Sequence, residues 1–420
     1  MPKRCSWRLV CGAILTIGTE EGRLEPPIYF GVAVWGPTFC ESFVTGALAS
    51  LLAEGNIPAL SNNSKKNTFI IYTRKVDWEW LTMQAMVKLL QQYMQIEFIE
   101  LAELSEQEYQ LLNNPLKSRK LYLMTMGHRQ IVNRMYAEHA IGSIIIVDSI
   151  YAKYSISAAY KHIAQGKTAV LVFCPRFATT AMIEELRERK YIIPGNPLAL
   201  SSRELLAIAM RHQHLDLQMQ EWDRPTIPEV MLETSWPLPN KSGKLFYTWS
   251  CWCAFVDYSK LKTHNVESLG NNTIDGVYWG ENLTKESSHF ITDSDEFTLV
   301  SFSSPIDRRR LIPIRRSFRA KAIMARCKLA FARQRIKYMM HGQTDPFKLW
   351  FANKPIYMHT KDLMPDCLRL KKSTQGIINK IVNKKFTMHD QILLHLNEPH
   401  LWQKVFSKKL FVKIYRVIFR

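Results

Sequence analysis

The stretch IYFGVAVWG, Ile28–Gly36, has the composition of a buried β-strand and ends at a glycine–proline pair. It opens a series in which short apolar runs alternate with segments of helical period. The further predicted strands are TFIIYT (Thr68–Thr73), IEFIE (Ile96–Glu100), SIIIVDS (Ser143–Ser149) and TAVLVF (Thr168–Phe173). This alternation predicts an α/β fold with a mostly parallel sheet and helices on both faces.

Local signals place helices between these strands. Thr38 and Glu41 have the spacing of a capping box, in which the two side chains bond to backbone N–H groups. Asp77 is expected to cap a helix that runs to about Met94. A further helix is predicted at residues 155–165. Each predicted helix follows one strand and leads into the next, which is how parallel strands are connected.

Three side chains stand where the predicted strands end. Trp35 follows the first strand, Arg74 follows the second, and Asp148 lies at the end of SIIIVDS. In open parallel sheets ligands bind beyond the carboxyl ends of the strands, so these residues are candidate binding groups. The sequence has no GxGxxG after the first strand, no P-loop motif and no GxSxG. Their absence argues against a dinucleotide-dependent dehydrogenase, a P-loop NTPase and an α/β-hydrolase.

Residues 236–258 are rich in tryptophan, tyrosine and phenylalanine. Strands in a protein core have this composition. Flat aromatic faces also stack on sugar rings and nucleotide bases, which makes Trp249 and Trp252 candidate substrate-binding residues. The sequence leaves both interpretations open.

Short carboxylates and histidines further along the chain are candidate metal ligands. Asp275 stands in the stretch TIDGVYW, and Asp293 and Asp295 form an Asp-x-Asp pair in DSDE. Such a pair can place two oxygens on one Mg²⁺ or Mn²⁺, although Asp-Gly and Asp-Ser are also simple turn formers. In RHQHL, His212 and His214 would face different sides of a helix but could share a metal ion on a strand.

Composition excludes some classes of protein. Apolar residues make up 47% and charged residues 22% of the 420-residue chain, as expected for a globular protein of two or three domains. No apolar run reaches the roughly 18 residues that cross a bilayer. The 8 cysteines include no CxxC pair, which argues against a cysteine-based zinc site. Residues 1–27 have the outline of a signal peptide without a convincing cleavage site, which favours a short anchor or an unstructured extension.

The positive charge of the chain is concentrated at its carboxyl end. Residues 301–420 contain 27 Lys and Arg against 6 Asp and Glu, whereas residues 1–300 contain 29 against 31. Drawn as a helix, Leu401–Arg420 has bulky apolar side chains on one face and basic ones mostly on the other. This pattern is typical of a helix that lies in an anionic membrane interface. Packing on its own domain and nucleic-acid binding are the alternatives.

Several of these stretches resemble a group of bacterial glycosyltransferase-like proteins of GT-A type. The similarity is carried by IYFGVAVWGPTF, SLLAEGNIPAL and FIIYT, and more loosely by SIIIVDS, RHQHL, TIDGVYW and DSDE. It covers about residues 28–305. Members are usually placed in envelope polysaccharide or lipopolysaccharide assembly. The resemblance implies a GT-A-like, Rossmann-like domain over residues 28–305, with residues 1–27 as an extension and residues 306–420 as a basic, mainly helical region.

The resemblance also implies a nucleotide-sugar donor over the first strands. Mn²⁺ or Mg²⁺ is often held there by an Asp-x-Asp motif after a central strand. In this chain the corresponding position reads Asp148-Ser149-Ile150, with one carboxylate. Asp148 would therefore work with Asp275 or with the carboxylates of DSDE, or basic groups would replace the metal ion.

The resemblance assigns roles to four candidate residues. Trp35 and Arg74 would contact the nucleotide, Asp148 the donor, and Asp275 would be the catalytic base or a sugar contact. The predicted function is transfer of a sugar to a membrane-associated glycan or lipid-linked acceptor, by a cytoplasmic enzyme peripheral to the inner membrane. The alternative is a non-catalytic nucleic-acid- or membrane-binding protein on a degenerate glycosyltransferase-like fold.

Overall fold

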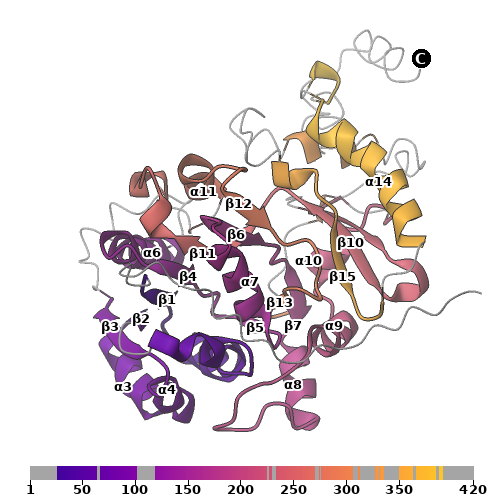
Figure 1. Ribbon diagram of the computed structural model, residues 1–420. Coiled ribbons are helices and arrows are strands. Elements are labelled where there is room, and N and C mark those ends of the chain that lie inside the picture. Colours follow the sequence, from indigo (N-terminus) through magenta and orange to yellow (C-terminus); the bar gives the residue numbers. More distant parts are fainter. Residues whose placement is uncertain are drawn as a thin grey trace, which may run out of the picture.

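The computed structural model describes residues 26–63, 67–101, 119–224, 227–228, 233–269, 274, 276–305, 311–312, 326, 328–330, 332–334, 350–362, 366–384 and 387–390. These residues form a mixed α/β fold around a seven-stranded sheet with the order β12-β6-β11-β4-β1-β2-β3 (Figure 1). Its strands are β1 (Ile28–Ala33), β2 (Thr68–Thr73), β3 (Gln95–Glu100), β4 (Ile141–Ile144), β6 (Ala169–Val172), β11 (Trp252–Asp257) and β12 (Ser288–Phe290).

The sheet is mostly parallel, as the alternating pattern predicts. Strand β1 pairs in parallel with β2 and β4, β2 pairs with β3, and β6 pairs with β12. Strand β11 is antiparallel to both of its neighbours, β4 and β6. Strands β1 and β2 are buried along their whole length, which explains their uninterrupted apolar sequences.

Helices connect the strands and cover both faces of the sheet. The helical segments are α1 (Pro37–Ser42), the π-helix η1 (Phe43–Leu48), α2 (Ala49–Leu51), η2 (Ile57–Asn63), α3 (Lys75–Met83), α4 (Ala85–Leu90), α6 (Arg119–Ala137), α7 (Ser155–Ala164), α8 (Ala181–Glu188), α9 (Ser202–Arg211), α10 (Leu215–Met219), η3 (Pro239–Lys241), η4 (Tyr258–Lys260), η5 (Val266–Leu269), α11 (Gly276–Asn282) and α14 (Asp366–Val382).

The alternation of side chains along β1 separates the two helical layers. The ring of Phe30 contacts Phe255 of β11, which in turn contacts Tyr160 of α7. The next residue, Gly31, faces the opposite side, because successive side chains point to opposite faces of a strand. A Cβ at Gly31 would lie 2.3 Å from Cγ2 of Ile131, so glycine lets α6 approach the sheet closely. Helix α6 is thereby fixed on β1, with its first turns near the carboxyl end of that strand.

The start of α1 differs from the predicted capping box. Gly36 is the N-cap residue with a positive φ of 83°, and no side chain caps the helix. The N–H of Gly36 instead donates to the Asp77 carboxylate at 3.0 Å. Asp77 therefore does not cap α3, which begins after Arg74 and ends at Met83. The extended backbone of Gln84 then separates α3 from α4, so the predicted single helix to Met94 is wrong.

The stretch SIIIVDS is also divided, where one strand was expected. Strand β4 ends at Ile144, Val147 and Asp148 form a turn, and β5 (Ser149–Tyr151) leaves the central sheet. The Ser149 hydroxyl donates to the Ile146 carbonyl at 2.6 Å and closes this turn. Strand β5 joins a second sheet of order β5-β13-β7, whose other strands are β13 (Leu299–Ser303) and β7 (Arg176–Thr179).

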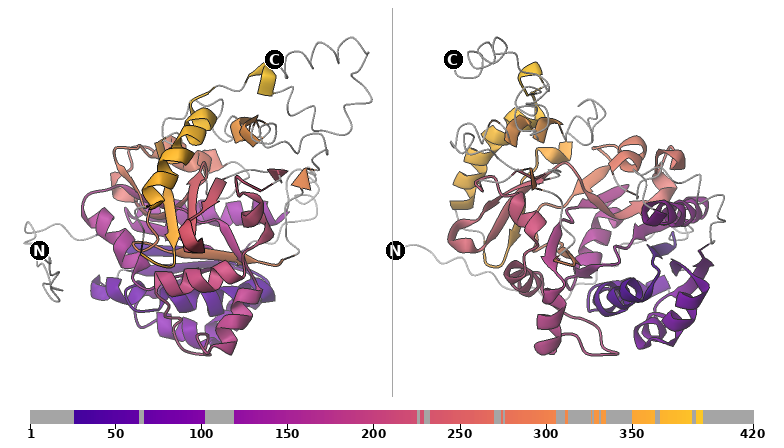
Figure 2. Two further views of the ribbon diagram at one scale, coloured as in Figure 1. Left: turned by 90° about the vertical axis from the view of Figure 1, so that its right-hand side faces the viewer. Right: turned by 180° about the vertical axis from the view of Figure 1, so that it is seen from behind.

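A further three-stranded sheet has the order β15-β10-β9. Its strands are β9 (Glu233–Pro237), β10 (Gly243–Thr248) and β15 (Ile356–His359), and a two-stranded pair is formed by β8 (Ile227–Pro228) and β14 (Leu311–Ile312). Helix α14 contributes Ile378 and Ile381 to a second apolar cluster with Tyr247 of β10. Figure 2 shows α14 alongside this sheet from two further sides.

The three-stranded sheet crosses the boundary predicted at residue 305. Strand β15 comes from the basic region, yet it pairs antiparallel with β10. The division of the chain into residues 28–305 and 306–420 stays a prediction. Among the residues that the structure describes, no helix combines the length and apolarity needed to cross a bilayer.

Candidate functional site

A cleft of about 480 Å³ opens at the carboxyl edge of the central sheet. We call it the sheet-edge cleft. The end of β1, the turn after β4 and the start of antiparallel β11 all meet there. Its lining residues are Ala33, Val34, Trp35, Phe39, Leu121, Met124, His128, Ile145, Ile146, Val147, Asp148, Cys174, Arg176, Trp252, Ser301 and Phe302.

The position of the cleft follows from the strand order. From β1 the chain passes through α1, η1, α2 and η2 to β2, and from β2 through α3 and α4 to β3, all on one side of β1. Strand β4 lies on the other side of β1. The chain connections therefore diverge between β1 and β4, and open α/β sheets bind ligands beyond the strand ends at such a switch point. Trp35 and Asp148 follow these two strands and line the cleft together.

Trp252 is held over the cleft by its indole N–H, which donates to the Ile144 carbonyl at 2.9 Å. Because β11 is antiparallel, its first residue lies at the same edge as the last residues of β1 and β4. The structure thus brings three of the predicted site residues, Trp35, Asp148 and Trp252, to one cavity.

Arg176 adds a cationic group that the sequence analysis did not select. Its Nη1 lies 3.2 Å from Oδ2 of the buried Asp216. The N–H of Asp216 in turn donates to Nδ1 of fully buried His214 at 3.1 Å, and His214 Nε2 lies 3.2 Å from the Ser304 carbonyl. This chain of hydrogen bonds orients the guanidinium, which shares the cleft lining with Asp148.

His128 is a second residue that the sequence analysis did not select. It lies on α6 and is 3% exposed, and its Nδ1 accepts a hydrogen bond from the Ile274 N–H at 3.2 Å. Burial lowers the pKa of His128 to about 4. The imidazole is therefore neutral at neutral pH and carries its proton on Nε2, so it can donate a hydrogen bond without adding charge.

Cys174 lines the same cleft but is not set up as a nucleophile. Burial raises the pKa of its thiol, and the negative charge of Asp148 raises it further. The thiolate is the reactive form of cysteine. Cys174 therefore lines the cleft as a protonated, unreactive thiol at neutral pH.

Arg74 is not among the described residues that line the cleft. Its guanidinium bonds to Asp77 at 2.6 and 3.0 Å. Burial opposes ionisation of Asp77, but the bonds from Arg74 and from the Gly36 N–H outweigh it and lower the pKa of that carboxyl group. In this structure Arg74 supports the turn that follows Trp35.

The remaining predicted site residues lie elsewhere. Trp249 is 0% exposed and belongs to the second apolar cluster, so its ring presents no face to a substrate in this structure. Asp275 lies outside the described residues. Asp293 and Asp295 lie in the connection between β12 and β13, and neither lines the sheet-edge cleft.

The two carboxylates Asp293 and Asp295 already have side-chain partners. Asp295 makes a bidentate ion pair with Arg203 at 2.7 and 3.0 Å. Asp293 Oδ1 lies 2.9 Å from His359 Nε2. Burial lowers the pKa of His359, but the hydrogen bond to Asp293 outweighs that effect and raises it above its usual value. Metal binding by these two carboxylates stays a prediction. An ion there would compete with Arg203, whereas His359 is close enough to bind the same ion.

The histidines of RHQHL do not converge on one point. His212 ends α9 and its Nε2 lies 2.5 Å from Glu185 Oε2, whereas His214 caps α10 with its Nδ1. The two rings have separate partners, which leaves no common metal site for them in this arrangement.

We expect ionised Glu185 to stabilise the folded state, so that the free energy of unfolding falls when the pH becomes acidic. The hydrogen bond from Arg211 lowers the pKa of Glu185 to about 2 against the opposing effect of burial, and His212 adds to the lowering. A carboxyl group whose pKa is lower in the folded state stabilises the fold at pH values above its pKa in the unfolded chain, about 4.3. This stabilisation is lost as the pH falls towards about 2. Glu185→Gln should cost about 1 kcal/mol at pH 7 and flatten the acid limb measured by urea denaturation. Glu188→Gln, at an exposed position, is the control, and equal acid limbs for wild type and Glu185→Gln would contradict the expectation.

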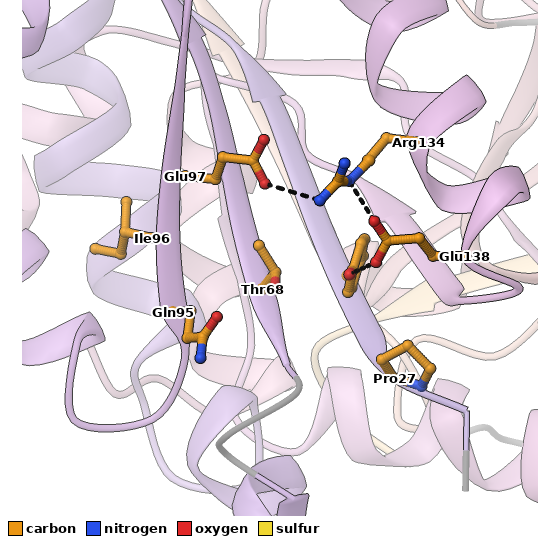
Figure 3. A pocket seen from close by; sticks show the side chains of 8 residues that line it. Pro27, Thr68, Gln95, Ile96, Glu97, Arg134 and Glu138 are labelled. Atoms are coloured by element: carbon orange, nitrogen blue, oxygen red, sulfur yellow. Dashed lines mark hydrogen bonds and ion pairs between the residues drawn. The ribbon is translucent and has the colours of Figure 1, made fainter. Parts of the chain in front are cut away.

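A second cavity, of about 540 Å³, lies at the opposite edge, where β1, β2 and β3 begin (Figure 3). Arg134 bridges Glu138 at 2.5 Å and Glu97 at 3.7 Å, and the Tyr29 hydroxyl donates to Glu138. Burial raises the pKa of Tyr29, and Glu138 raises it further. Two carboxylates beside one guanidinium disfavour an anionic ligand, so this cavity suits a phosphate-bearing ligand less well than the sheet-edge cleft.

No family model matches this chain, and no curated protein matches it. Among solved structures, the apo crystal structure of mouse xyloside xylosyltransferase 1 is similar at 12% sequence identity with a TM-score of 0.25. The similarity covers 44% of this chain and 69% of the other. A TM-score at this level is too low to support an inference about fold or activity.

Proposed function

We propose that this protein is a glycosyltransferase of GT-A type that binds a nucleotide-sugar donor in the sheet-edge cleft. The observation that supports this most directly is that Trp35, Asp148, Arg176 and Trp252 line one cavity at the switch point of the sheet. These residues come from four separate segments of the chain, so the fold, not local sequence, assembles the cavity.

The lining residues match the chemistry of such a donor. The flat faces of Trp35 and Trp252 suit a nucleotide base or a sugar ring. The diphosphate leaving group needs positive charge, which the guanidinium of Arg176 can supply. Asp148 would contact the donor sugar.

A divalent cation is compatible with this donor set. Mg²⁺ and Mn²⁺ are often held by one or two carboxylates together with substrate phosphates. Asp148, the carboxylate among the described lining residues, would hold the ion, which would neutralise the diphosphate. Arg176 offers a second source of positive charge in the same cleft.

The acceptor is proposed to be a membrane-associated glycan or lipid-linked molecule of the bacterial envelope. Support comes from the basic excess of residues 301–420 and from the amphipathic pattern of Leu401–Arg420. That terminal stretch lies outside the described residues. A protein working at the cytoplasmic face of the inner membrane would fit this charge distribution.

Donor binding tests the proposal directly. The purified chain is screened by thermal shift against UDP-, GDP-, ADP- and CMP-linked sugars, with and without Mn²⁺. A donor that binds the folded state alone raises the melting temperature. We expect one nucleotide class to do so, and Trp252→Leu to weaken its affinity by about tenfold or more, since stacking on a base contributes about 1–3 kcal/mol.

Trp80→Leu is the matched control, because Trp80 lies on α3 and is 37% exposed. It should leave donor affinity unchanged. Absence of a shift with every donor would contradict the proposal. If the same preparation then bound DNA of any sequence with strong salt dependence, the nucleic-acid-binding alternative would replace it.

A further inference from the structure

Two histidines and one glutamate from three elements meet at the edge of the central sheet. His162 lies on α7, His289 on the edge strand β12, and Glu296 in the connection from β12 to β13. One ring nitrogen from each histidine and one oxygen of Glu296 all lie within 4.8 Å of one another. More than one hundred residues separate His162 from the other two in the sequence, so only the fold brings them together.

His162 contacts both of the other side chains. His162 Nε2 lies 2.5 Å from Glu296 Oε1. The rings of His162 and His289 stack with centroids 3.7 Å apart and an interplanar angle of 17°. The side chains of His162 and Glu296 are 18% and 38% exposed. The cluster is therefore anchored by packed elements and open to water on one side.

Two imidazoles and one carboxylate are a ligand set for a borderline transition-metal ion. Zn²⁺ binds histidine nitrogen at about 2.0–2.1 Å and carboxylate oxygen at about 2.0–2.2 Å. Tetrahedral ligands at these lengths lie roughly 3.3 Å apart. The two ring planes are nearly parallel, so one histidine has to rotate out of the stack to direct both nitrogens at a single ion. Mg²⁺ and Ca²⁺ prefer sites made of oxygen alone. Three protein ligands leave a fourth position for a water molecule from the open side.

We propose that His162, His289 and Glu296 form a zinc-binding site that ties α7 to the edge strand β12. None of the three is among the described residues that line the sheet-edge cleft, so this inference is independent of the proposed transferase activity. An edge strand has one neighbour in its sheet, and β12 pairs with β6 over Ser288–Phe290. A metal ion held between β12 and α7 would add a cross-link there.

The surroundings limit the expected affinity. Lys167 and Lys354 lie close enough to act electrostatically on His289. Their positive charges oppose a divalent cation. We therefore expect a dissociation constant in the micromolar range.

Calorimetric titration of the full chain tests the site. The protein is purified without a polyhistidine tag, stripped with a chelator and titrated with Zn²⁺. We expect one Zn²⁺ per chain, with binding weakened at least tenfold by His289→Gln and by Glu296→Gln. His212→Gln is the matched control, because His212 also pairs with a glutamate but lies in a different cluster. Co²⁺ should give the visible absorption bands of a tetrahedral site in the wild type and lose them in His289→Gln.

Melting temperatures distinguish loss of the site from loss of the fold. Zn²⁺ should raise the melting temperature of the stripped wild type and of His212→Gln, but not of the two site variants. If His289→Gln proves unstable without metal, Glu296→Gln decides, because its amide keeps the size of the carboxylate and can still bond to His162. Zinc affinity unchanged in Glu296→Gln, or no zinc binding by the wild type, would overturn the proposal.

Discussion

Asp148→Asn is expected to lower the rate of sugar transfer by about a hundredfold or more. A preorganised charge that stabilises developing charge in the transition state commonly contributes about 10²–10³ in rate. The substitution keeps the shape of the side chain and removes its negative charge. Asp148 sits in a turn closed by the bond from the Ser149 hydroxyl to the Ile146 carbonyl. Asparagine has nearly the same volume and leaves that bond in place, so the fold should survive the change.

The measurement needs no identified acceptor. The donor that gives the largest thermal shift is incubated with the enzyme, and release of the nucleoside diphosphate through slow transfer to water is followed. Asp223→Asn, at an exposed position, is the matched control and should retain the wild-type rate. If Asp148→Asn binds the donor and releases the nucleoside diphosphate at the wild-type rate, Asp148 has no catalytic role.

Lys328→Met is expected to destabilise the folded state by about 3 kcal/mol. Lys328 is 1% exposed, and its ammonium group donates to the carbonyls of Glu221, Trp222 and Arg224 at 2.9, 2.5 and 2.6 Å. Burial lowers its pKa to about 8, so it remains largely protonated at neutral pH. Methionine fills a similar volume but leaves these carbonyls without their donor. A buried polar group that loses its partner costs about 1–3 kcal/mol.

Urea denaturation at pH 7 measures the change in the free energy of unfolding. Lys161→Met on α7 is the control, because Lys161 is exposed and its loss should change stability by less than about 0.5 kcal/mol. A Lys328→Met variant as stable as this control would show that the three carbonyls find other partners. The result also measures how strongly the basic carboxyl-terminal region is held to the rest of the fold. Lys328 belongs to that region, and its hydrogen bonds go to the segment around Trp222.

Periodicity alone predicted the central architecture. The apolar runs at residues 28–36 and 68–73 became β1 and β2, because a strand covered on both faces must be apolar throughout. The rule that ligands bind beyond carboxyl ends then selected Trp35 and Asp148, which the structure places in one cleft. Both inferences depend on short-range pattern and on general sheet geometry.

The sequence did not predict which candidate side chains would be buried and which would be paired. Trp249 and Trp252 are three residues apart in the same aromatic stretch, yet one is fully buried and the other lines the cleft. Arg74 has the right position in the chain for a ligand, but its guanidinium is bonded to Asp77. Composition does not distinguish such cases, because burial and pairing depend on what the rest of the chain packs against each residue.

The sequence by itself determined the class of fold, the first strands of the central sheet and the uneven distribution of charge, because these follow from local periodicity and composition. Only the tertiary structure decided that Arg176 and His128 share the cleft with Asp148, and that His162 meets His289 and Glu296. These groups lie far apart along the chain, and the order of strands in the sheet, which no local pattern specifies, brings them within reach of one another.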